Sequence, residues 1–321
     1  MVDRIRKLSF SVSSPSSSSA VLLSRCSFFK GRVSLLDFYA KDRILCNGKI
    51  IGESVPVQQG DVLTVLTPQS FEPVVSSSFS ILFEDEHLLV VDKPAPLPLH
   101  PAGRFYFNTL TSFLQENGYS SLFPVHRLDK ETSGVVVFAK SKEVAVSLSS
   151  QFVEQKVRKV YLALIEGVVP DGVVNLPLKK VSRGEIRDLM IVADDGLPSQ
   201  TEFQTIDSSN SVSLLLIRPR SGRRHQIRAH LASLGSCLIG EKLYHRDPSF
   251  FIAFMKDPRS FSSEEISQAC GASRHFLHAF SLSFTHPVSG EVVSFSSPFP
   301  SDMVEKCKQE KIYYSKVTKY L

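Results

Sequence analysis

Residues 126–134 have the sequence His-Arg-Leu-Asp-Lys-Glu-Thr-Ser-Gly and precede the apolar run Val135-Val136-Val137-Phe138. Because β-branched and aromatic residues suit a pleated, covered surface, we predict that this run is a buried strand. Asp129 then lies in the loop that enters a core strand. A carboxylate so close to a core costs free energy unless a partner neutralises it or a reaction uses it. We therefore expect a cationic partner from elsewhere in the chain.

The composition is that of a globular protein with a mild basic excess. The chain has 321 residues, of which 42% are hydrophobic, and a net charge of +5. This length suits one large domain with an appendage. The five cysteines include no Cys-x-x-Cys pair, which argues against a zinc knuckle or a secreted disulfide framework and favours an intracellular compartment. No apolar run approaches the ~18 residues of a membrane span, so we expect no membrane partner.

The first 31 residues differ from the rest of the chain. No acidic residue occurs between Asp3 and Asp37, and serines crowd positions 9–27. This composition is typical of an organellar transit peptide and equally of a disordered tail. We predict a leader over residues 1–31. As a transit peptide it would direct the chain to a plastid or mitochondrion, and as a plain tail it would leave the chain in the cytoplasm or nucleus.

Residues 32–73 are predicted to form a small module. Asn47-Gly48 lies between apolar flanks and indicates a hairpin, and Gly60-Asp61 precedes a further strand. The pattern resembles the second half of an S4-type RNA-binding module, in which two helices normally precede the hairpin. Those helices are nearly absent here. We therefore expect a truncated S4-like element, with a simple structural hairpin as the alternative.

The main domain is predicted over residues 79–300, with a surface insertion at 247–273 and a basic tail at 301–321. On the helix expected at 142–155 we take Val146, Phe152 and Val153 as buried candidates. Strands and helices mix without a regular strand-helix-strand alternation, which favours an α+β fold. The expected elements are strands at 79–87, 88–91, 156–166, 200–205, 212–217, 276–284 and 291–295, and helices at 109–117, 142–155 and 224–234.

Several other chemistries fit the Asp129 loop poorly. A kinase catalytic loop has His-Arg-Asp, but here a leucine intervenes and no other kinase motif accompanies it. Asp129 and Glu131 are too close in sequence to flank a sugar as a glycosidase pair. His225 and His230 are five residues apart among arginines, whereas helical metal ligands favour a spacing of four. The chain also lacks the glycine-rich motifs of nucleotide and nicotinamide sites.

Five motifs together resemble the RluA-type pseudouridine synthases and occur in the order of that family. Besides residues 126–134 they are Lys93-Pro94 with His100-Pro101, residues 159–167, residues 222–231 and residues 277–287. The resemblance implies a pseudouridine synthase fold with a mixed, mainly antiparallel sheet and flanking helices. The sequence His100-Pro-Ala-Gly-Arg104 with Asn108-Thr109 is similar to the eukaryotic branch, some members of which modify tRNA.

The resemblance also implies roles for individual residues. Asp129 matches the catalytic carboxylate and Tyr161 the tyrosine beside the uracil, while Arg228 is the matched partner of Asp129. Arg127 corresponds to the arginine that fills the space of the flipped base. The remaining candidates for RNA contact are His126, Lys93, Arg220, Arg223 and Arg224.

The implied reaction is the isomerisation of uridine to pseudouridine in tRNA or rRNA. It needs no cofactor and no metal, and its partner is RNA. No obligate protein partner is evident, so we expect a monomer. The alternative is an RNA-binding module that keeps the fold without turnover. Whether Asp129 attacks C6, attacks C1′ or assists a glycal route stays open.

Overall fold

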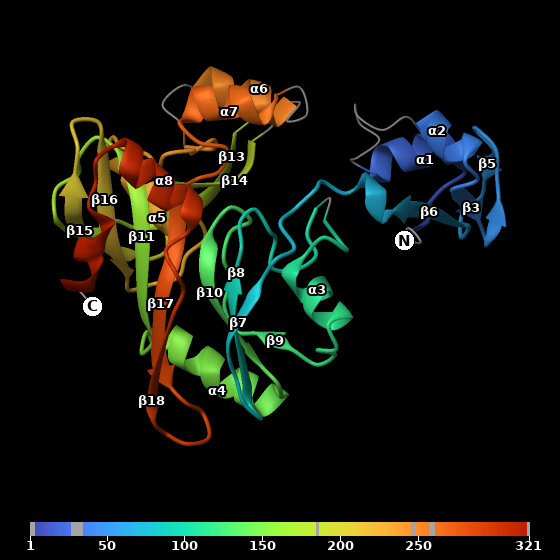
Figure 1. Ribbon diagram of the computed structural model, residues 1–321. Helices are drawn as coiled ribbons and strands as arrows, with labels where there is room; N and C mark the ends of the chain where they lie inside the picture. The colour runs from blue at the N-terminus through green and yellow to red at the C-terminus, as the bar shows by residue number, and fades with distance from the viewer. Residues whose placement is uncertain are drawn as a thin grey trace. The chain divides into compact units, whose positions relative to one another are not determined.

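The computed structural model describes residues 4–26, 35–103, 105–183, 186–244, 248–256 and 261–319. The chain divides into two compact units (Figure 1). The smaller comprises Met1–Val74 and His100–Phe113, and the larger comprises Val75–Leu99 and Leu114–Leu321. Within the described ranges, every helix is too short or too polar to cross a membrane.

The smaller unit contains a four-stranded antiparallel sheet in the order β1-β6-β3-β4. β1 (Ile5–Ser11) pairs along its whole length with β6 (Val62–Pro68), which also pairs with β3 (Ile44–Cys46). β3 turns into β4 (Lys49–Ile50) through Asn47-Gly48, whose φ values of 48° and 80° suit a tight hairpin turn. The predicted hairpin is confirmed. The unit also contains β2 (Ser16–Ser17), β5 (Pro56–Val57) and the 3₁₀ turn Gln69–Phe71.

Two short helices cover this sheet. α1 (Ser18–Arg25) begins after Ser17, whose hydroxyl accepts a hydrogen bond from the backbone of Ala20. α2 (Leu35–Ala40) follows in the chain. Both helices join the core of the unit, since Leu22 and Phe38 are fully buried together with strand residues such as Leu63.

Two predictions for this region are wrong. Residues 5–25 are not a disordered leader, because β1 alternates exposed and partly covered residues at the period of a strand and α1 packs into the core. Helices before the hairpin are not missing, because α1 and α2 both precede β3. Helix α1 was not predicted because it lies in the serine-rich segment. Serine has only a moderate helix propensity, although it is a good N-cap.

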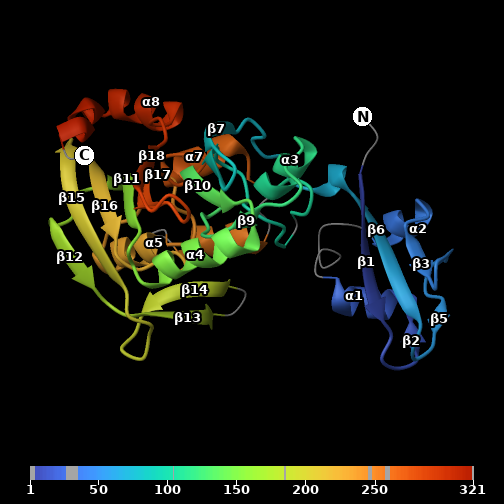
Figure 2. The same cartoon turned by 90° about the horizontal axis from the view of Figure 1, so that it is seen from below.

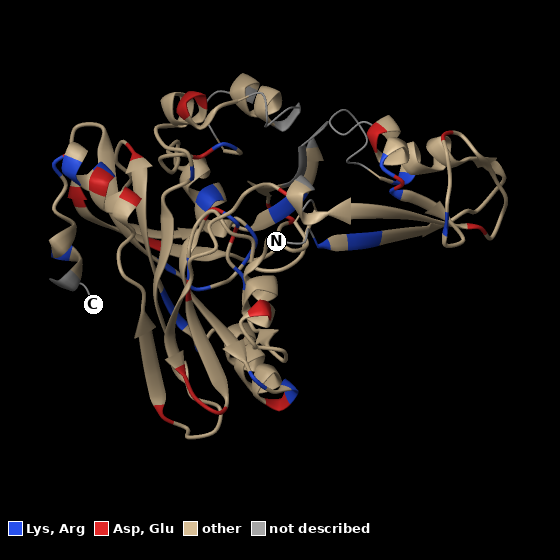
Figure 3. Ribbon diagram, turned by 45° about the vertical axis from the view of Figure 1, so that its right-hand side comes forward, with Lys and Arg blue, Asp and Glu red and all other residues tan. Residues whose placement is uncertain are grey.

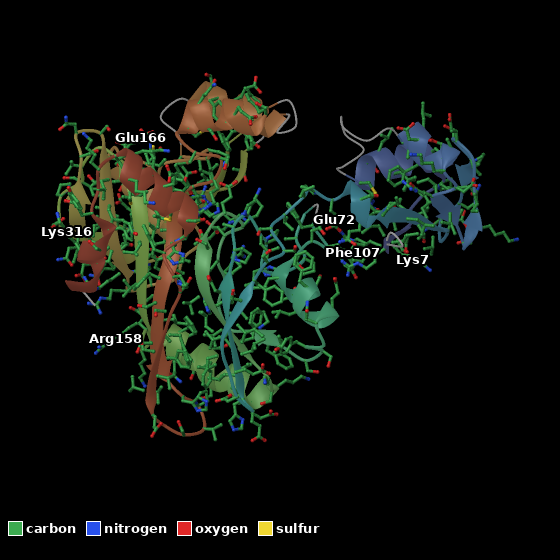
Figure 4. The ribbon with its side chains drawn as sticks, in the orientation of Figure 1. Lys7, Glu72, Phe107, Arg158, Glu166 and Lys316 are labelled. Atoms are coloured by element: carbon green, nitrogen blue, oxygen red, sulfur yellow. The ribbon has the colours of Figure 1, made fainter. Side chains whose placement is uncertain are left out.

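The segment His100–Phe113 belongs to the smaller unit, although we predicted it within the catalytic domain. The carboxylate of Glu72 accepts hydrogen bonds from the backbone N–H groups of Phe107 and Asn108, at 2.9 and 2.8 Å, and Figure 4 shows Glu72 beside Phe107. The guanidinium of Arg4 lies 4.6 Å from the ring centre of Phe107. These contacts join the segment to the residue before β1 and to the residue after the 3₁₀ turn that follows β6.

The larger unit is organised around a ten-stranded sheet whose main path is β12-β15-β16-β11-β17-β10-β8-β7, with β18 beside β17 and β9 beside β10. The pairs are antiparallel except for β10 with β17. The mainly antiparallel sheet of the predicted α+β fold is confirmed. The strands are β7 (Ser80–Glu84), β8 (Leu88–Lys93), β9 (Phe123–Pro124), β10 (Ser133–Ala139), β11 (Arg158–Glu166), β12 (Gly172–Asn175), β15 (Gln200–Ser208), β16 (Val212–Pro219), β17 (Leu277–Thr285) and β18 (Val292–Ser296).

Strand β10 is the predicted buried strand, and all seven of its residues are buried. The signature stretch ends at Gly134 because no other residue fits there. Its φ is 114°, and an added Cβ would lie 2.2 Å from the carbonyl oxygen of Ala279. Only a residue without a side chain lets β10 and β17 approach so closely. The loop that carries Asp129 is thereby fixed to the middle of the sheet.

Helices cover both faces of the sheet, and Figure 2 shows α5 and α8 on opposite sides of it. Ile227 and Leu231 of α5 (Gln226–Ser233) pack on Leu215, whereas Met303 of α8 (Ser301–Gln309) packs with Leu214. Successive strand residues point to opposite faces, which accounts for the two layers. The other elements of the unit are α3 (Leu110–Glu116, which begins in the smaller unit), α4 (Lys142–Val153), the hairpin β13 (Leu178–Arg183) and β14 (Ile186–Val192), α6 (Pro248–Lys256), α7 (Ser263–Cys270) and the 3₁₀ helix Tyr314–Lys319.

Two details of the prediction for this unit need correction. Helix α4 buries Val144 and Leu148, whereas Val146 and Val153 are 73% and 80% exposed. The predicted tail at 301–321 is instead part of the fold, since Met303 and Cys307 are fully buried. The packing of this segment was not predicted because its lysines suggested a solvated tail. They lie on the outer face of an amphipathic helix.

Candidate active site

A pocket of about 430 Å³ opens beside the signature loop in the larger unit. Its walls come from residues 125–129 and 132, the end of α4, the start of β11, Pro219 with residues 221–228 that lead into α5, and Leu277 of β17. Figure 3 marks the positions of Lys and Arg in blue and of Asp and Glu in red along the ribbon. The charged and aromatic side chains of its lining include His126, Arg127, Asp129, Tyr161, Arg223, Arg224, His225 and Arg228.

Asp129 forms an ion pair with an arginine from elsewhere in the chain. Its side chain is 20% exposed, and its Oδ2 atom accepts a hydrogen bond of 2.9 Å from Nη1 of Arg228. Arg228 lies in the first turns of α5, which packs on the sheet through Ile227 and Leu231. The predicted ion pair is confirmed.

Arg228 is held from behind by a second carboxylate. Nε and Nη2 of Arg228 donate to Oε2 and Oε1 of Glu241, at 2.8 and 2.7 Å, and the Glu241 side chain is 1% exposed. Glu241 also accepts hydrogen bonds from the backbone N–H groups of Lys242 and Leu243. Such a forked pair fixes the plane of the guanidinium. Glu241 was not predicted from the sequence, in which it resembles a carboxylate of an ordinary surface turn.

These contacts set the ionisation of the site. Burial would raise the pKa of Asp129, but the charge of Arg228, with contributions from His225 and His275, lowers it to about 2. Burial would likewise raise the pKa of Glu241, yet Arg228 holds it well below its ordinary value. Both carboxylates are therefore anionic at neutral pH. The shared guanidinium stays charged because the two carboxylates raise its pKa.

Tyr161 lies on β11 beside the pocket, next to a bulge that separates it from Val160. Burial, and then the nearby charge of Asp129, raise the pKa of its hydroxyl above the ordinary value. The hydroxyl is therefore protonated at neutral pH and can donate a hydrogen bond, but it is not an anionic base.

For the uridine isomerisation that the motif resemblance implies, we expect Tyr161→Phe to slow a single turnover only modestly, by less than about tenfold, and Tyr161→Leu to slow it by roughly 10²-fold or more. Phenylalanine keeps the flat ring that can stack on a flipped base, while leucine loses it. Single-turnover rates on one RNA, with melting temperatures as the folding control, measure both. Equal rates for phenylalanine and leucine would contradict the stacking role.

The predicted RNA contacts fall into two groups. Arg127, Arg223 and Arg224 are exposed and line the pocket, so their position is compatible with phosphate binding. Arg220 is also exposed, but it lies outside the pocket lining and 3.6 Å from Glu202.

Lys93 is the clearest error among the predicted RNA contacts. Its side chain is fully buried, and Nζ donates to the carbonyl oxygens of Leu97 and Pro94, at 2.8 and 3.0 Å. A longer contact of 3.4 Å reaches the carbonyl of Lys130 in the signature loop. Lys93 therefore stabilises this loop from inside the protein and cannot reach a phosphate.

His126 lines the pocket but also has a structural partner. Its Nε2 accepts a hydrogen bond of 3.0 Å from the backbone N–H of Val137, and its ring stacks on Phe152 at 5.0 Å. Burial, followed by the charge of Lys159, lowers the pKa of His126 to about 4, so the ring is neutral. These contacts hold the loop against β10 and α4.

The alternative chemistries find no support in the geometry. Glu131 is bound to Nζ of Lys242 at 2.7 Å and to the backbone of His275, so it is not paired with Asp129 across a substrate. His230 contacts Thr201 and the carbonyl of Leu176 through its two ring nitrogens, at 2.8 and 3.0 Å. A metal would have to displace both contacts. We therefore discard the glycosidase and metal hypotheses.

Comparison with known proteins identifies the class to which this fold and pocket belong. Residues 87–233 match the family described as RNA pseudouridylate synthase. The chain is also 34% identical over 258 residues to the ribosomal large subunit pseudouridine synthase D of Xanthomonas campestris, covering 78% of this chain and 74% of that protein. The chain therefore belongs to the RluA-type family of RNA pseudouridine synthases.

Individual relatives differ in their RNA. The protein of the same name from Nitrosomonas europaea is 39% identical, but the match covers 70% of this chain and 62% of that protein. The mitochondrial tRNA pseudouridine(32) synthase of Saccharomyces cerevisiae is 33% identical over 60% of this chain and 43% of its own length. Among solved structures, human RNA pseudouridylate synthase domain containing 4 aligns with a TM-score of 0.56 at 25% identity, covering 72% of this chain and 93% of that one.

Proposed function

We propose that this chain isomerises specific uridines to pseudouridine in tRNA or rRNA, with Asp129 as the catalytic carboxylate. The observation that carries the proposal is the anionic Asp129 in a pocket, paired with Arg228 at 2.9 Å. Family membership supplies the reaction class. The charge of Arg228 keeps the carboxylate of Asp129 ionised at neutral pH, although its side chain is only 20% exposed.

The reaction breaks the C1′–N1 bond, turns the uracil and joins C5 to C1′. N1 gains a proton and C5 loses one, so the change is an isomerisation. Attack of a carboxylate on C1′ or on C6 requires an anionic oxygen, and so does removal of the C2′ proton on the glycal route. The low pKa of Asp129 satisfies this requirement for each route.

The base must leave its stack before it can react, at a cost of a few kcal/mol. We assign Tyr161 to stacking on the flipped uracil and Arg127 to the vacated space, because both line the pocket that holds Asp129. Arg223 and Arg224 then contact phosphates at its edge. Phosphate contacts position the RNA without selecting bases.

We expect the double variant Arg223→Gln, Arg224→Gln to bind RNA more weakly and with a flatter salt dependence. Each lost contact to single-stranded RNA reduces the slope of log K against log salt by about 0.7. Binding titrations between low and moderate salt measure the slope. Lys308→Gln, an exposed lysine on α8, is the matched control and should leave the slope unchanged. An unaltered slope in the double variant would exclude these arginines from phosphate contact.

We further propose that the smaller unit helps to capture RNA as an S4-like module. Two short helices followed by the Asn47-Gly48 hairpin and β6 agree with the expected order of elements in such a module. We also propose a monomer as the working form.

We propose an organellar location, in line with the mitochondrial yeast relative. Cleavage after α1 would remove β1 and α1 from the core, so we expect residues 5–25 to remain in the mature protein. Imaging of the full chain with a C-terminal fluorescent tag, and N-terminal sequencing of the purified protein, test both points.

Pseudouridine mapping of RNA tests the proposed reaction. Cells that lack the protein are complemented with the wild type or with Asp129→Asn, and both proteins are checked for folding. We expect a defined set of sites to return only with the wild type. Identical maps, with RNA bound by both proteins, would replace the enzyme by a binding module without turnover.

A further inference from the structure

His225 is the second side chain that faces Asp129, and no motif argument singled it out for this role. It stands directly before α5 with φ 49° and ψ 19°, the left-handed region that residues with a side chain rarely adopt. Such a conformation is strained and persists only where the surroundings impose it. The ring is 10% exposed and lines the pocket.

Two contacts define the orientation of the ring. Nε2 of His225 lies 3.8 Å from Oδ2 of Asp129. On the other side, Nδ1 lies 3.3 Å from the hydroxyl of Tyr244, and the two rings meet edge to face with centroids 6.0 Å apart. The imidazole therefore lies between a carboxylate and a phenol.

The hydrogen bonds favour one tautomer of the His225 ring. The hydroxyl oxygen of Tyr244 already accepts a hydrogen bond of 3.0 Å from the backbone N–H of Met190. Its own proton is then available for Nδ1 of His225, which leaves the ring proton on Nε2. The opposite tautomer would turn the Nε2 lone pair toward the anionic oxygen of Asp129, which is unfavourable. Both considerations give the Nε2–H form.

Residues 241–244 contact both Arg228 and His225, the two side chains that face Asp129. Tyr244 lies under Arg228, with the guanidinium carbon 5.3 Å from the ring centre, while Glu241 three residues earlier holds the guanidinium by two hydrogen bonds. Arg228 and His225 both approach Oδ2 of Asp129. Within the described residues these are the contacts of the carboxylate oxygens, and they leave Oδ1 for the substrate.

We infer that His225 is a positioning residue for Asp129: as a neutral Nε2–H imidazole fixed by Tyr244, it points its N–H dipole at Oδ2 from 3.8 Å, beyond direct hydrogen-bond distance, and with the hydrogen bond from Arg228 orients the carboxylate so that Oδ1 faces the uridine. This inference rests on the proposed function. Burial, followed by the charge of Arg228, lowers the pKa of His225 to about 4, in agreement with a neutral ring. The neutral ring of His225 therefore orients the carboxylate of Asp129. It adds no second positive charge, which would reduce the nucleophilicity of that carboxylate.

The tautomer can be measured without any activity. Long-range ¹H–¹⁵N spectra of the full chain labelled at histidine, with His225 assigned from the spectrum of His225→Gln, distinguish the neutral tautomers and the imidazolium. We expect the Nε2–H form at pH 7 in the wild type and a mixture of neutral tautomers in Tyr244→Phe. An imidazolium or an Nδ1–H ring in the wild type would overturn the inference. An unchanged spectrum in Tyr244→Phe would overturn the part given to Tyr244.

Single-turnover kinetics test the consequence for Asp129. His225→Ala should slow pseudouridine formation by about 10²-fold, as a misoriented reacting group does, with the Kd for RNA within about twofold of the wild type. His225→Gln, which keeps an N–H donor at a similar reach, should recover most of the rate. His87→Gln, which changes a histidine at the β7–β8 turn, is the control and should be unaffected.

A wild-type rate in His225→Ala, or equal losses in the alanine and glutamine variants, would overturn the positioning role. If the wild type forms no pseudouridine in any RNA, the proposed function fails instead, and the tautomer measurement still decides the geometry. If His225→Ala does not fold, the glutamine variant and the spectra keep the test decisive.

Discussion

Asp129→Asn is expected to abolish pseudouridine formation, by roughly 10⁴-fold or more, while leaving the affinity for RNA unchanged. Removal of a reacting group costs this much in enzymes where a single side chain carries the chemistry. Asparagine has nearly the shape of aspartate and can still accept the hydrogen bond from Arg228, which keeps its second carboxylate, Glu241. Single-turnover assays and RNA titrations on the same preparation separate the two quantities.

The same variant has a defined effect on stability. The pKa of Asp129 is about 2 in the folded chain and 3.8 for the free side chain, so the ion pair contributes roughly 2 kcal/mol. Because the folded-state pKa is the lower one, this contribution is present above about pH 4 and is lost as the pH falls toward 2. Urea titrations at pH 7 and in this acidic window should show the difference between wild type and variant shrinking. Retained turnover in a folded Asp129→Asn protein would remove Asp129 from the reaction.

The sequence predicted the site residues best where they lie in a short motif whose residue types are recognisable together. Asp129, Tyr161 and Arg228 lie together around the pocket as the family resemblance implied. Glu241 was missed because a single carboxylate before a lysine resembles an ordinary surface turn. Only the fold brings it 2.7 Å from Arg228. Lys93 was misjudged for a related reason, since a lysine in a loop is usually solvated and its inward orientation depends on the carbonyls around it.

The fold was predicted in outline, and its errors have physical causes. The buried run at 135–138 identified β10 because strands covered on both faces are continuously apolar. The face of α4 was misplaced because valines occur on both sides of that helix, so Val146 and Val153 were taken as core. β1 was missed because its alternating pattern includes Arg6 and Lys7. The pairing with β6, far away in the sequence, stabilises it as a strand.

Glu241→Gln is expected to destabilise the chain by about 3–5 kcal/mol and to slow turnover by roughly 10²-fold. Glu241 is the buried partner of Arg228, and removal of one charge of a buried pair leaves the other insufficiently compensated. The amide group also places a donor where the guanidinium already donates. Arg228 then loses the fork that fixes its plane, and the orientation of Asp129 deteriorates with it. Urea denaturation and single-turnover rates at pH 7 measure both effects.

The pH dependence distinguishes this role from a general loss of packing. Arg228 lowers the pKa of Glu241 below the ordinary 4.5, so its contribution exists above that value and is lost as the pH falls through the lower folded-state pKa. The stability of the glutamine variant should therefore depend less on pH below about 4.5 than that of the wild type. Glu202→Gln is the matched control, because Glu202 pairs with Arg218 where both side chains are about 30% exposed, and it should cost less than about 1 kcal/mol. Equal losses in the two glutamine variants would mean that the buried fork does not stabilise the site.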